Sequence, residues 1–531
     1  MVQGLVLQLD KYFDPFLIGF GRHMKTGVEI DHSIVSGLLS SMEAGEKQFK
    51  DFVDLRLKTT GEDRMNLFDK LVNLKIRTGQ EKAKKDSKAV NVLKEDRQAF
   101  GVLVGKATTP EEAHSHPLTT VPLALATQER DLRQGSKATL RNYLIDECTS
   151  IIEEPPNRGN WLIDGMAAVK SIPSQMTWGE YADILLKFCL PPRQSKPLRI
   201  GIIFDSYSIA TRKQLTQRRR GVSDRITHIT SPEQSMPKGK DWDSFLQNAE
   251  NKTELIRFLV HYFKTDSVRS KLKIPLTVRE EENTWLITQT NIEKLESCNH
   301  DEADTRLVLH ASQSTGPVII RATDTNVVIL LSYAYSVCKP LQDWLMKIDH
   351  RYVSVNKLTT HFGDEVCEVL PAYHSIAGCD TTSFPFRIGK IKPIKKMIKQ
   401  EKFRLLSKLG RSAHSVQDVT SAKCFFRTCM YSGSDQESFV ETRIRMYNIQ
   451  KVKSSSSILP DESSTNEHLK RSDLQTMVWR QCLKQNIQYP SITDRGWKET
   501  DDGIRPIWFT CPQLPPSISM EKGRKIQKQS K

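Results

Sequence analysis

The sequence lacks closely paired cysteines and any long apolar run. Its ten cysteines are dispersed and form no Cys-x-x-Cys pair, which argues against a zinc site or a disulfide framework. The longest apolar run, Val327–Val337, contains two serines and is far shorter than the roughly 20 residues of a membrane span. Residues Met1–Phe20 lack the order of basic, apolar and small residues that marks a signal peptide. We therefore expect an intracellular protein, nuclear or cytoplasmic and not secreted, without a membrane partner.

The chain has fewer acidic than basic residues: 63 aspartates and glutamates and 78 lysines and arginines, which gives a formal net charge of +15. This excess favours a polyanionic partner such as nucleic acid, although it says nothing about the fold. A mean hydropathy of -0.46 with 38% hydrophobic residues is typical of a soluble, folded protein. The length of 531 residues predicts two or three structural units.

Composition divides the chain into three parts. Residues 1–158 form an N-terminal region of unassigned role with a Pro-rich linker, and residues 403–531 form a helical C-terminal extension. That extension contains a polar loop, 454–467, predicted to be disordered, and a basic tail. Between them, residues 159–402 alternate short apolar runs with helical stretches, which predicts an α/β core. The predicted strands are Asn160–Ile163, Leu198–Phe204, Thr284–Thr288 and Pro317–Arg321, and the predicted helices are Trp242–Phe263, Glu302–Ser312 and Thr325–Val337.

Acidic residues follow three of the predicted strands. Asp164 and Asp205 come directly after apolar runs, and Asp324 follows the run that ends at Arg321. Because the carboxyl ends of parallel strands form the ligand-binding edge of an open sheet, these acids are expected to converge. Each could also be a simple helix N-cap, since aspartate is common there.

Two further acidic motifs lie at helix starts and turns. Glu302 and Asp304 open a predicted helix and could reach one cation, although acids there also complement the helix dipole. Asp380 lies in a turn with Gly378, ahead of several lysines that are either a solvated helix face or a grip on a phosphate backbone.

The order of these motifs resembles the PIN-like core of flap endonucleases and their relatives. The matching pieces are Ile163-Asp164-Gly165, Phe204-Asp205 followed by basic residues, Glu302-Ala303-Asp304, the strand before Asp324, and Gly378-Cys379-Asp380. The resemblance covers about residues 160–402 and is closest to a group of uncharacterised animal proteins that carry this domain. It implies a mainly parallel sheet flanked by helices and a helix–two-turn–helix element at Asp380. Outside the span of the resemblance, the additional N- and C-terminal regions are expected to be mostly helical.

The resemblance also implies a function. The expected catalytic residues and metal ligands are Asp164, Asp205, Glu302, Asp304, Asp324 and Asp380, which would hold Mg²⁺ or Mn²⁺ for two-metal hydrolysis of DNA or RNA. Where the family has a second acid, this chain has Asn326, expected to be an auxiliary metal contact. The expected nucleic-acid contacts, with DNA favoured over RNA, are Lys213, Arg218, Arg219, Arg220, Gly378, Gly389, Lys390, Lys392, Lys395 and Lys396.

The sequence is also compatible with two alternatives. Asn326 carries no charge, so the domain could be a weak or inactive adaptor that binds nucleic acid or protein. A basic structural protein without a nucleic-acid partner would require acids that serve only as caps and never meet. The spatial convergence of the six carboxylates separates this last reading from the other two.

Overall fold

The computed structural model describes residues 41–58, 100–148, 151–152, 154–192, 194–207, 226–349, 351–411, 419–449, 455–500 and 503–518. The chain forms two compact units, Met1–Lys88 and Ala89–Lys531. Of the first unit, the structure describes helix α3 (Ser41–Val53) and the π-helical turn that follows it. The second unit contains every candidate site residue that the structure describes.

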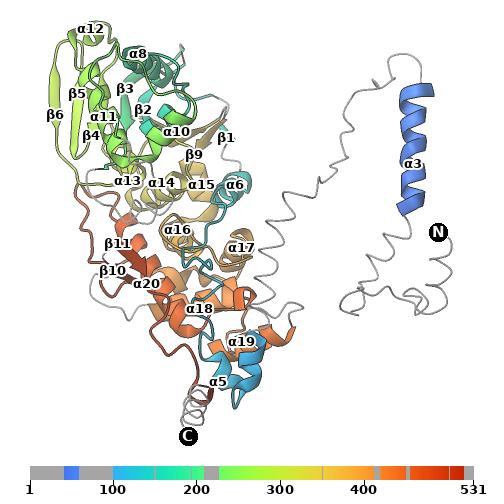
Figure 1. Cartoon of the computed structure of the whole chain (residues 1–531). Coiled ribbons are helices and arrows are strands. Elements are labelled where there is room, and N and C mark those ends of the chain that lie inside the picture. The colour runs from blue at the N-terminus through green and yellow to red at the C-terminus, as the bar shows by residue number, and fades with distance from the viewer. Residues whose placement is uncertain are drawn as a thin grey trace. The chain divides into compact units, whose positions relative to one another are not determined.

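A nine-stranded sheet forms the centre of the second unit (Figure 1). Its strands, in spatial order, are β1 (Ile151–Ile152), β9 (Arg351–Ser354), β8 (Trp344–Ile348), β7 (Val318–Arg321), β2 (Arg158–Asp164), β3 (Lys196–Ile203), β4 (Leu276–Glu280), β5 (Asn283–Ile287) and β6 (Ile292–Leu295). The run from β8 to β4 is parallel, whereas the outer strands pair antiparallel.

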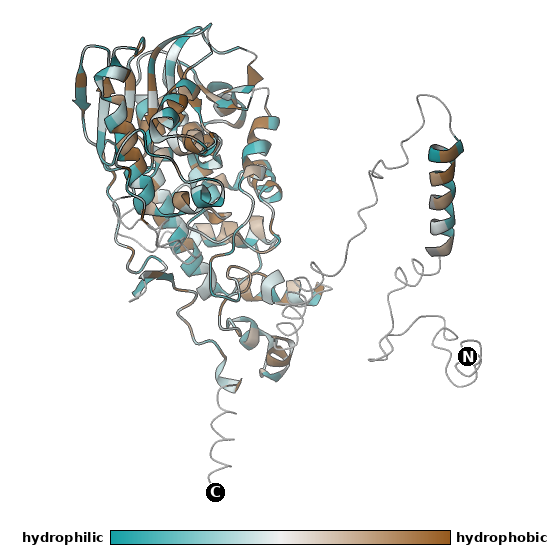
Figure 2. Ribbon diagram, turned by 45° about the horizontal axis from the view of Figure 1, so that its top comes forward, coloured by the Kyte–Doolittle hydropathy of each residue, from teal (hydrophilic) through white to brown (hydrophobic). Residues whose placement is uncertain are grey.

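Helices cover both faces of the sheet. One face carries α7 (Gly165–Lys170), α8 (Trp178–Cys189), α10 (Lys240–Gln247) and α11 (Ala249–Phe263). The other carries α6 (Ala138–Asp146), α13 (Ala303–Ser312), α14 (Thr325–Cys338), α15 (Val355–Phe362) and α16 (Asp364–Ile376). Successive strand residues alternate between the two cores, since Trp161 and Ile163 pack in the first and Leu162 in the second. Figure 2 shows the resulting concentration of apolar residues in the central strands and the helices against them.

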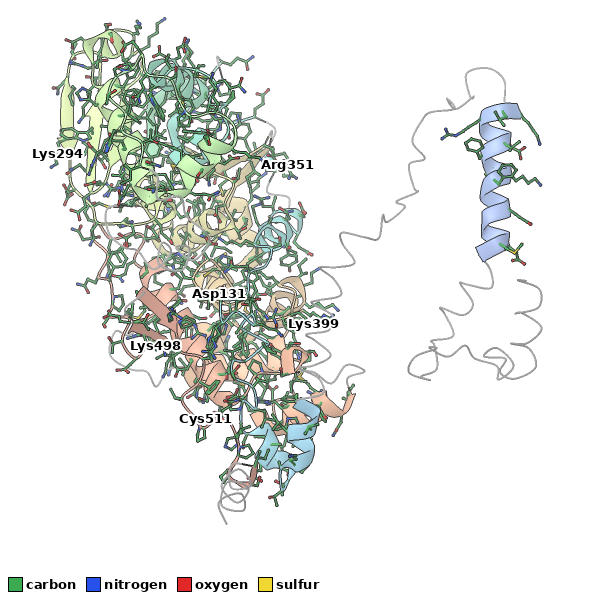
Figure 3. The ribbon with its side chains drawn as sticks, viewed as in Figure 1. Asp131, Lys294, Arg351, Lys399, Lys498 and Cys511 are labelled. Carbon is green, nitrogen blue, oxygen red and sulfur yellow. The ribbon has the colours of Figure 1, made fainter. Side chains whose placement is uncertain are left out.

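A helical layer continues from α16. It contains α17 (Ile391–Lys399), α18 (Val419–Phe425), α19 (Phe439–Ile449) and α20 (Glu462–Trp479), together with α5 (Pro110–His114) and the hairpin β10 (Trp497–Thr500) and β11 (Gly503–Pro506). Buried polar contacts join α16 to α20, including the Ser375 and Thr476 hydroxyls at 2.8 Å. Figure 3 labels Lys294 and Arg351 on the nine-stranded sheet, Lys399 at the end of α17 and Lys498 on β10.

The predicted mixed α/β fold with a large, mostly parallel sheet flanked by helices is confirmed. The four predicted strands coincide with β2, β3, β5 and β7. Two predictions were wrong in detail. The helix predicted over Trp242–Phe263 is two helices, because Asn248 ends α10 and caps α11 through hydrogen bonds from two backbone amides. The loop predicted to be disordered is helical from Glu462, since Asp461 caps α20. No helix among the described residues is long and apolar enough to cross a membrane.

Candidate functional site

The candidate site lies where the strand order of the sheet reverses. From β2 the chain moves outward to β3 and β4, and it then returns to place β7 and β8 on the other side of β2. Asp164 ends β2, Asp324 follows β7, and Asp205 follows β3. In open parallel sheets, ligands bind in the crevice at this switch point, beyond the carboxyl ends of the strands.

Asp164 caps helix α7 and faces two other carboxylates. Its Oδ1 atom accepts hydrogen bonds of 3.0 Å from the amides of Met166 and Ala167. Burial, reinforced by the charges of Asp205 and Asp324, raises the pKa of Asp164 to about 6 despite those bonds. A Cβ on the next residue, Gly165, would lie 2.5 Å from the ring of Phe204, so glycine permits the two strand ends to approach closely.

Asp205 connects the end of β3 to the start of α13. Its Oδ1 atom accepts a 2.7 Å hydrogen bond from the amide of Ala303, and its Oδ2 atom accepts one from the Tyr207 hydroxyl. The buried side chain of Arg279 on β4 supports the same junction, because its guanidinium donates to the carbonyls of Phe204 and His300. These bonds hold Asp205 beside the residues that begin α13.

A buried chain of hydrogen bonds ends at Asp304. The amide nitrogen of Asn326 donates to Asp304 Oδ2 at 3.0 Å, and the Oδ1 atom of Asn326 lies 2.9 Å from His374 Nε2. Lys390 Nζ lies 3.3 Å from the other ring nitrogen of His374. Burial lowers the pKa of His374 well below its ordinary value, so a neutral ring that donates to Asn326 and accepts from Lys390 satisfies every atom.

Lys137, the residue before α6, forms an ion pair with Asp380. Burial opposes the charge of Lys137, but Asp324 and Asp380 raise its pKa above the ordinary value, so the ammonium stays protonated at neutral pH. Asp380 lies two residues after Gly378, whose φ of 100° suits glycine in this turn. The turn lies between α16 and α17.

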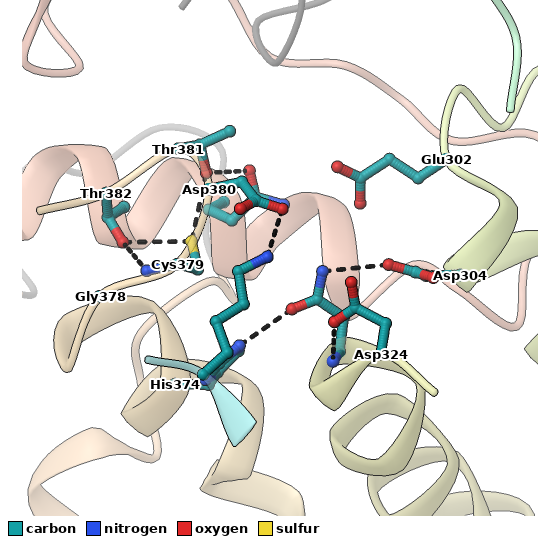
Figure 4. A network of polar contacts seen from close by, with 12 residues as sticks. Glu302, Asp304, Asp324, His374, Gly378, Cys379, Asp380, Thr381 and Thr382 are labelled. Carbon is teal, nitrogen blue, oxygen red and sulfur yellow. Dashed lines mark hydrogen bonds and ion pairs between the residues drawn. The ribbon is translucent and has the colours of Figure 1, made fainter. Parts of the chain in front are cut away.

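Glu302 is positioned by the C-terminal extension. Its Oε2 atom accepts a 3.3 Å hydrogen bond from the indole nitrogen of Trp479, the last residue of α20. The Trp479 ring in turn stacks on His374, with centroids 5.5 Å apart. In Figure 4 the carboxylates of Glu302, Asp304, Asp324 and Asp380 are directed toward a common space.

The structure thus brings six predicted residues into one region, called here the acid cluster: Asp164, Asp205, Glu302, Asp304, Asp324 and Asp380. Their oxygens are the donors that Mg²⁺ and Mn²⁺ prefer. The pKa of Asp164 is raised mainly by burial and secondarily by the charges of Asp205 and Asp324, and a cation would relieve that repulsion. The donor chemistry therefore fits a divalent metal. Within the described ranges, however, no group of three or more potential ligands is arranged closely enough to hold an ion. The carboxylates share a region but do not converge on one coordination point.

Asn326 does not fit its predicted role as a metal contact. Its amide oxygen faces His374 and its amide nitrogen donates to Asp304, so both ends of the side chain are engaged within the protein. The side chain is also buried, with 2% of its surface exposed. Asn326 instead fixes the orientation of Asp304.

The predicted nucleic-acid contacts lie in different surroundings. Lys390 is 3% exposed and donates to the carbonyl of Gly378, so its prediction as a phosphate contact was wrong. Lys395 forms an ion pair with Glu147, Lys396 donates to the Thr428 carbonyl, and Lys392 is exposed. Gly389 is open toward its surroundings. The basic residues Lys213, Arg218, Arg219 and Arg220 lie outside the described residues.

Sequence reasoning missed the residues that support the acids. Lys137 lies in a segment without any chemical motif, and only the fold brings it to Asp380. Arg279 is a charged residue inside a strand, a pattern that suggests an exposed position and not a buried support. His374 lies in the apolar helix α16, and an isolated histidine among apolar residues was the one local signal of a buried polar network.

Comparison of the chain with known protein families, with curated proteins and with solved structures found no match. The fold and the site therefore define only a class at this point: a mixed α/β protein whose sheet ends in clustered carboxylates at its switch point.

Proposed function

We propose that this chain is a PIN-like, metal-dependent nuclease that hydrolyses phosphodiester bonds in DNA or RNA. The observation that carries the proposal is the meeting of Asp164, Asp205 and Asp324 at the carboxyl edge of the parallel strands. Helix capping alone does not require three carboxylates to lie close enough for the charges of two of them to raise the pKa of the third. Clustered carboxylates at a sheet switch point are the arrangement that divalent metal chemistry on phosphates needs.

Asp164, Glu302, Asp324 and Asp380 are the residues that would hold Mg²⁺ or Mn²⁺. Such an ion, when bound, supplies positive charge to the phosphate oxygens and an activated water. Asp205 has both carboxylate oxygens in hydrogen bonds to the protein, which suits a residue that positions the start of α13. Glu302 then faces the cluster from the same helix start.

Lys137 lowers the net negative charge of the acid cluster, and the buried hydrogen-bond chain orients one of its carboxylates. The ammonium of Lys137 partly neutralises Asp380 and Asp324, which reduces the repulsion between the carboxylates and an approaching phosphate. Asn326 holds Asp304 in one orientation through its link to His374. Rigid support of this kind favours a site that is ordered before substrate arrives.

A second function, that of an adaptor without catalysis, is favoured by the same two side chains. Lys137 already places one cation in the cluster, and Asn326 replaces an acid of the family pattern with an engaged amide. Both features lower the negative charge with which the cluster could attract a metal. An adaptor would bind nucleic acid through its excess of positive charge and leave it intact.

The two functions are separated by a cleavage assay with the full-length chain. Single-stranded DNA, a DNA flap and RNA are incubated with Mg²⁺ or Mn²⁺, and DNA is the first substrate to test. The nuclease proposal predicts cleavage that Asp324→Asn reduces on the order of 100-fold or more. Asp241→Asn, an exposed aspartate on α10, is the matched control and is expected to leave the rate unchanged.

Binding to the same substrates is measured in the presence of a chelator. The nuclease proposal predicts that Asp324→Asn binds about as tightly as the native chain, because the Asp324 carboxylate acts in the transition state through the metal and not in binding the nucleic acid. Tight binding by a native chain that cleaves none of the three substrates with either metal would establish the adaptor function.

A further inference from the structure

A pocket of about 310 Å³ opens at the carboxyl edge of β2, β7 and β8, on the face of the sheet that carries α7 and α8. Asp164 lines this pocket and also belongs to the acid cluster, so the two sites share a wall. The basic side chains of the pocket are Arg321 and Lys347, and Ser171 and Asp349 also line it. None of the sequence motifs pointed to these residues.

Arg321 and Lys347 are neighbours on parallel strands. They are Cα partners in the register of β7 and β8, so both side chains leave the same face of the sheet. Burial and the charge of Arg321 lower the pKa of Lys347, which shows that the two cations act on each other. Neither forms an ion pair with a carboxylate in the part of the chain that the structure describes.

Contacts with Phe188 on helix α8 hold the Arg321 side chain in place. Its NH1 group donates a 2.7 Å hydrogen bond to the carbonyl of Phe188, and its guanidinium lies 3.9 Å from the centre of the Phe188 ring. The remaining donors of the guanidinium are therefore held in one orientation at the pocket. Planar, pre-oriented arginine donors match the oxygens of a phosphate.

We propose that the Arg321–Lys347 pocket binds the terminal phosphate of a nucleic-acid strand. The inference rests on the proposed function, because the adjoining phosphodiester would then lie at the acid cluster beyond Asp164. A terminal phosphate carries nearly two negative charges at neutral pH and matches two cations, whereas an internal phosphodiester carries one. Asp164 and Asp349 oppose an anion, so a cation at the acid cluster strengthens binding.

The test measures binding of short single-stranded DNA to the full-length chain by fluorescence anisotropy, in a chelator that prevents cleavage. Three strands are compared: one with a 5′-phosphate, one with a 3′-phosphate and one with neither. At least one terminal phosphate is expected to tighten binding about tenfold or more, since hydrogen bonds between charged groups contribute that much. Inorganic phosphate is tested separately as a competitor.

Arg321→Gln and Lys347→Met are each expected to remove most of this preference. The matched controls, Arg158→Gln and Lys196→Met, change an arginine and a lysine that are also Cα partners but begin their strands at the opposite edge of the sheet. These controls keep the preference. Arg321→Lys, which retains the charge, keeps part of it, and thermal denaturation shows that each variant is folded.

The proposal is overturned if the native chain binds all three strands equally or if the preference survives in both pocket variants. It also fails if inorganic phosphate competes as well as a phosphorylated strand, because the pocket would then serve a free anion. Cleavage without a phosphate preference refutes the pocket alone. A preference for a phosphorylated strand end in a chain that cleaves no substrate refutes the proposed nuclease function and leaves the pocket proposal standing.

Discussion

Replacement of Asp164 by asparagine is expected to stabilise the metal-free protein at neutral pH. The folded protein raises the pKa of this carboxyl from 3.8 to about 6, so the ionised form is disfavoured by folding. One pH unit of pKa shift corresponds to about 1.4 kcal/mol, and the whole shift to about 3 kcal/mol. Because Asp164 is only partly withdrawn from solvent, we expect an effect of about 1–3 kcal/mol.

The sign follows from linkage. A raised pKa means that the proton binds the folded state more tightly, so the stabilisation is complete below about pH 4 and is lost as pH rises through about 6. Asparagine stays neutral and can still accept the capping bonds from Met166 and Ala167. The advantage of Asp164→Asn should therefore appear above about pH 6 and disappear near pH 4.

The assay is urea unfolding of the full-length chain in a chelator, at about pH 4 and about pH 7. Asp241→Asn serves as the control, since surface substitutions usually change stability by less than about 0.5 kcal/mol. Saturating Mn²⁺ should reverse the order, because the native carboxylate binds the ion more tightly than the neutral amide and so stabilises the native chain more. A variant that is less stable than the native chain at pH 7, or a difference independent of pH, would refute the account of Asp164.

Three further substitutions test other parts of the site. Asn326→Asp, which places a second carboxylate beside Asp304 and adds repulsion that a cation would relieve, should lower the Mn²⁺ concentration needed for cleavage severalfold, as measured by a metal titration of the rate. Lys137→Met should tighten Mn²⁺ binding by about tenfold and lower the melting temperature in a chelator, because the carboxylates lose their internal cation. Trp479→Phe removes the hydrogen bond to Glu302 but keeps an aromatic ring, so cleavage should fall while the melting temperature changes by only a few degrees, about 1 kcal/mol.

The sequence predicted the parts of the site that depend on local pattern. Short apolar runs ending in Asp164, Asp205 and Asp324 marked strands of the parallel sheet, because buried parallel strands are apolar along their whole length. The placement of Glu302 at the start of α13 followed from the same kind of local signal. Carboxyl ends of parallel strands lie at one edge, which made the convergence of the acids predictable.

The supporting residues could not be predicted because the fold alone brings them close. Lys137 and Asp380 are far apart in the sequence, as are Trp479 and Glu302, and no motif relates them. The burial of Lys390 contradicted the general expectation that lysines stay exposed. Asp461 ended the polar loop early through a capping bond that composition does not reveal.

The claim on which this account depends is that the acid cluster holds a divalent metal. Isothermal calorimetry with Mn²⁺ on the full-length native chain and on Asp324→Asn tests it most directly. The account predicts binding by the native chain and a loss of affinity of about tenfold or more in the variant, equivalent to about 1.4 kcal/mol or more. Absence of binding by the native chain, or equal affinity in both proteins, would contradict it.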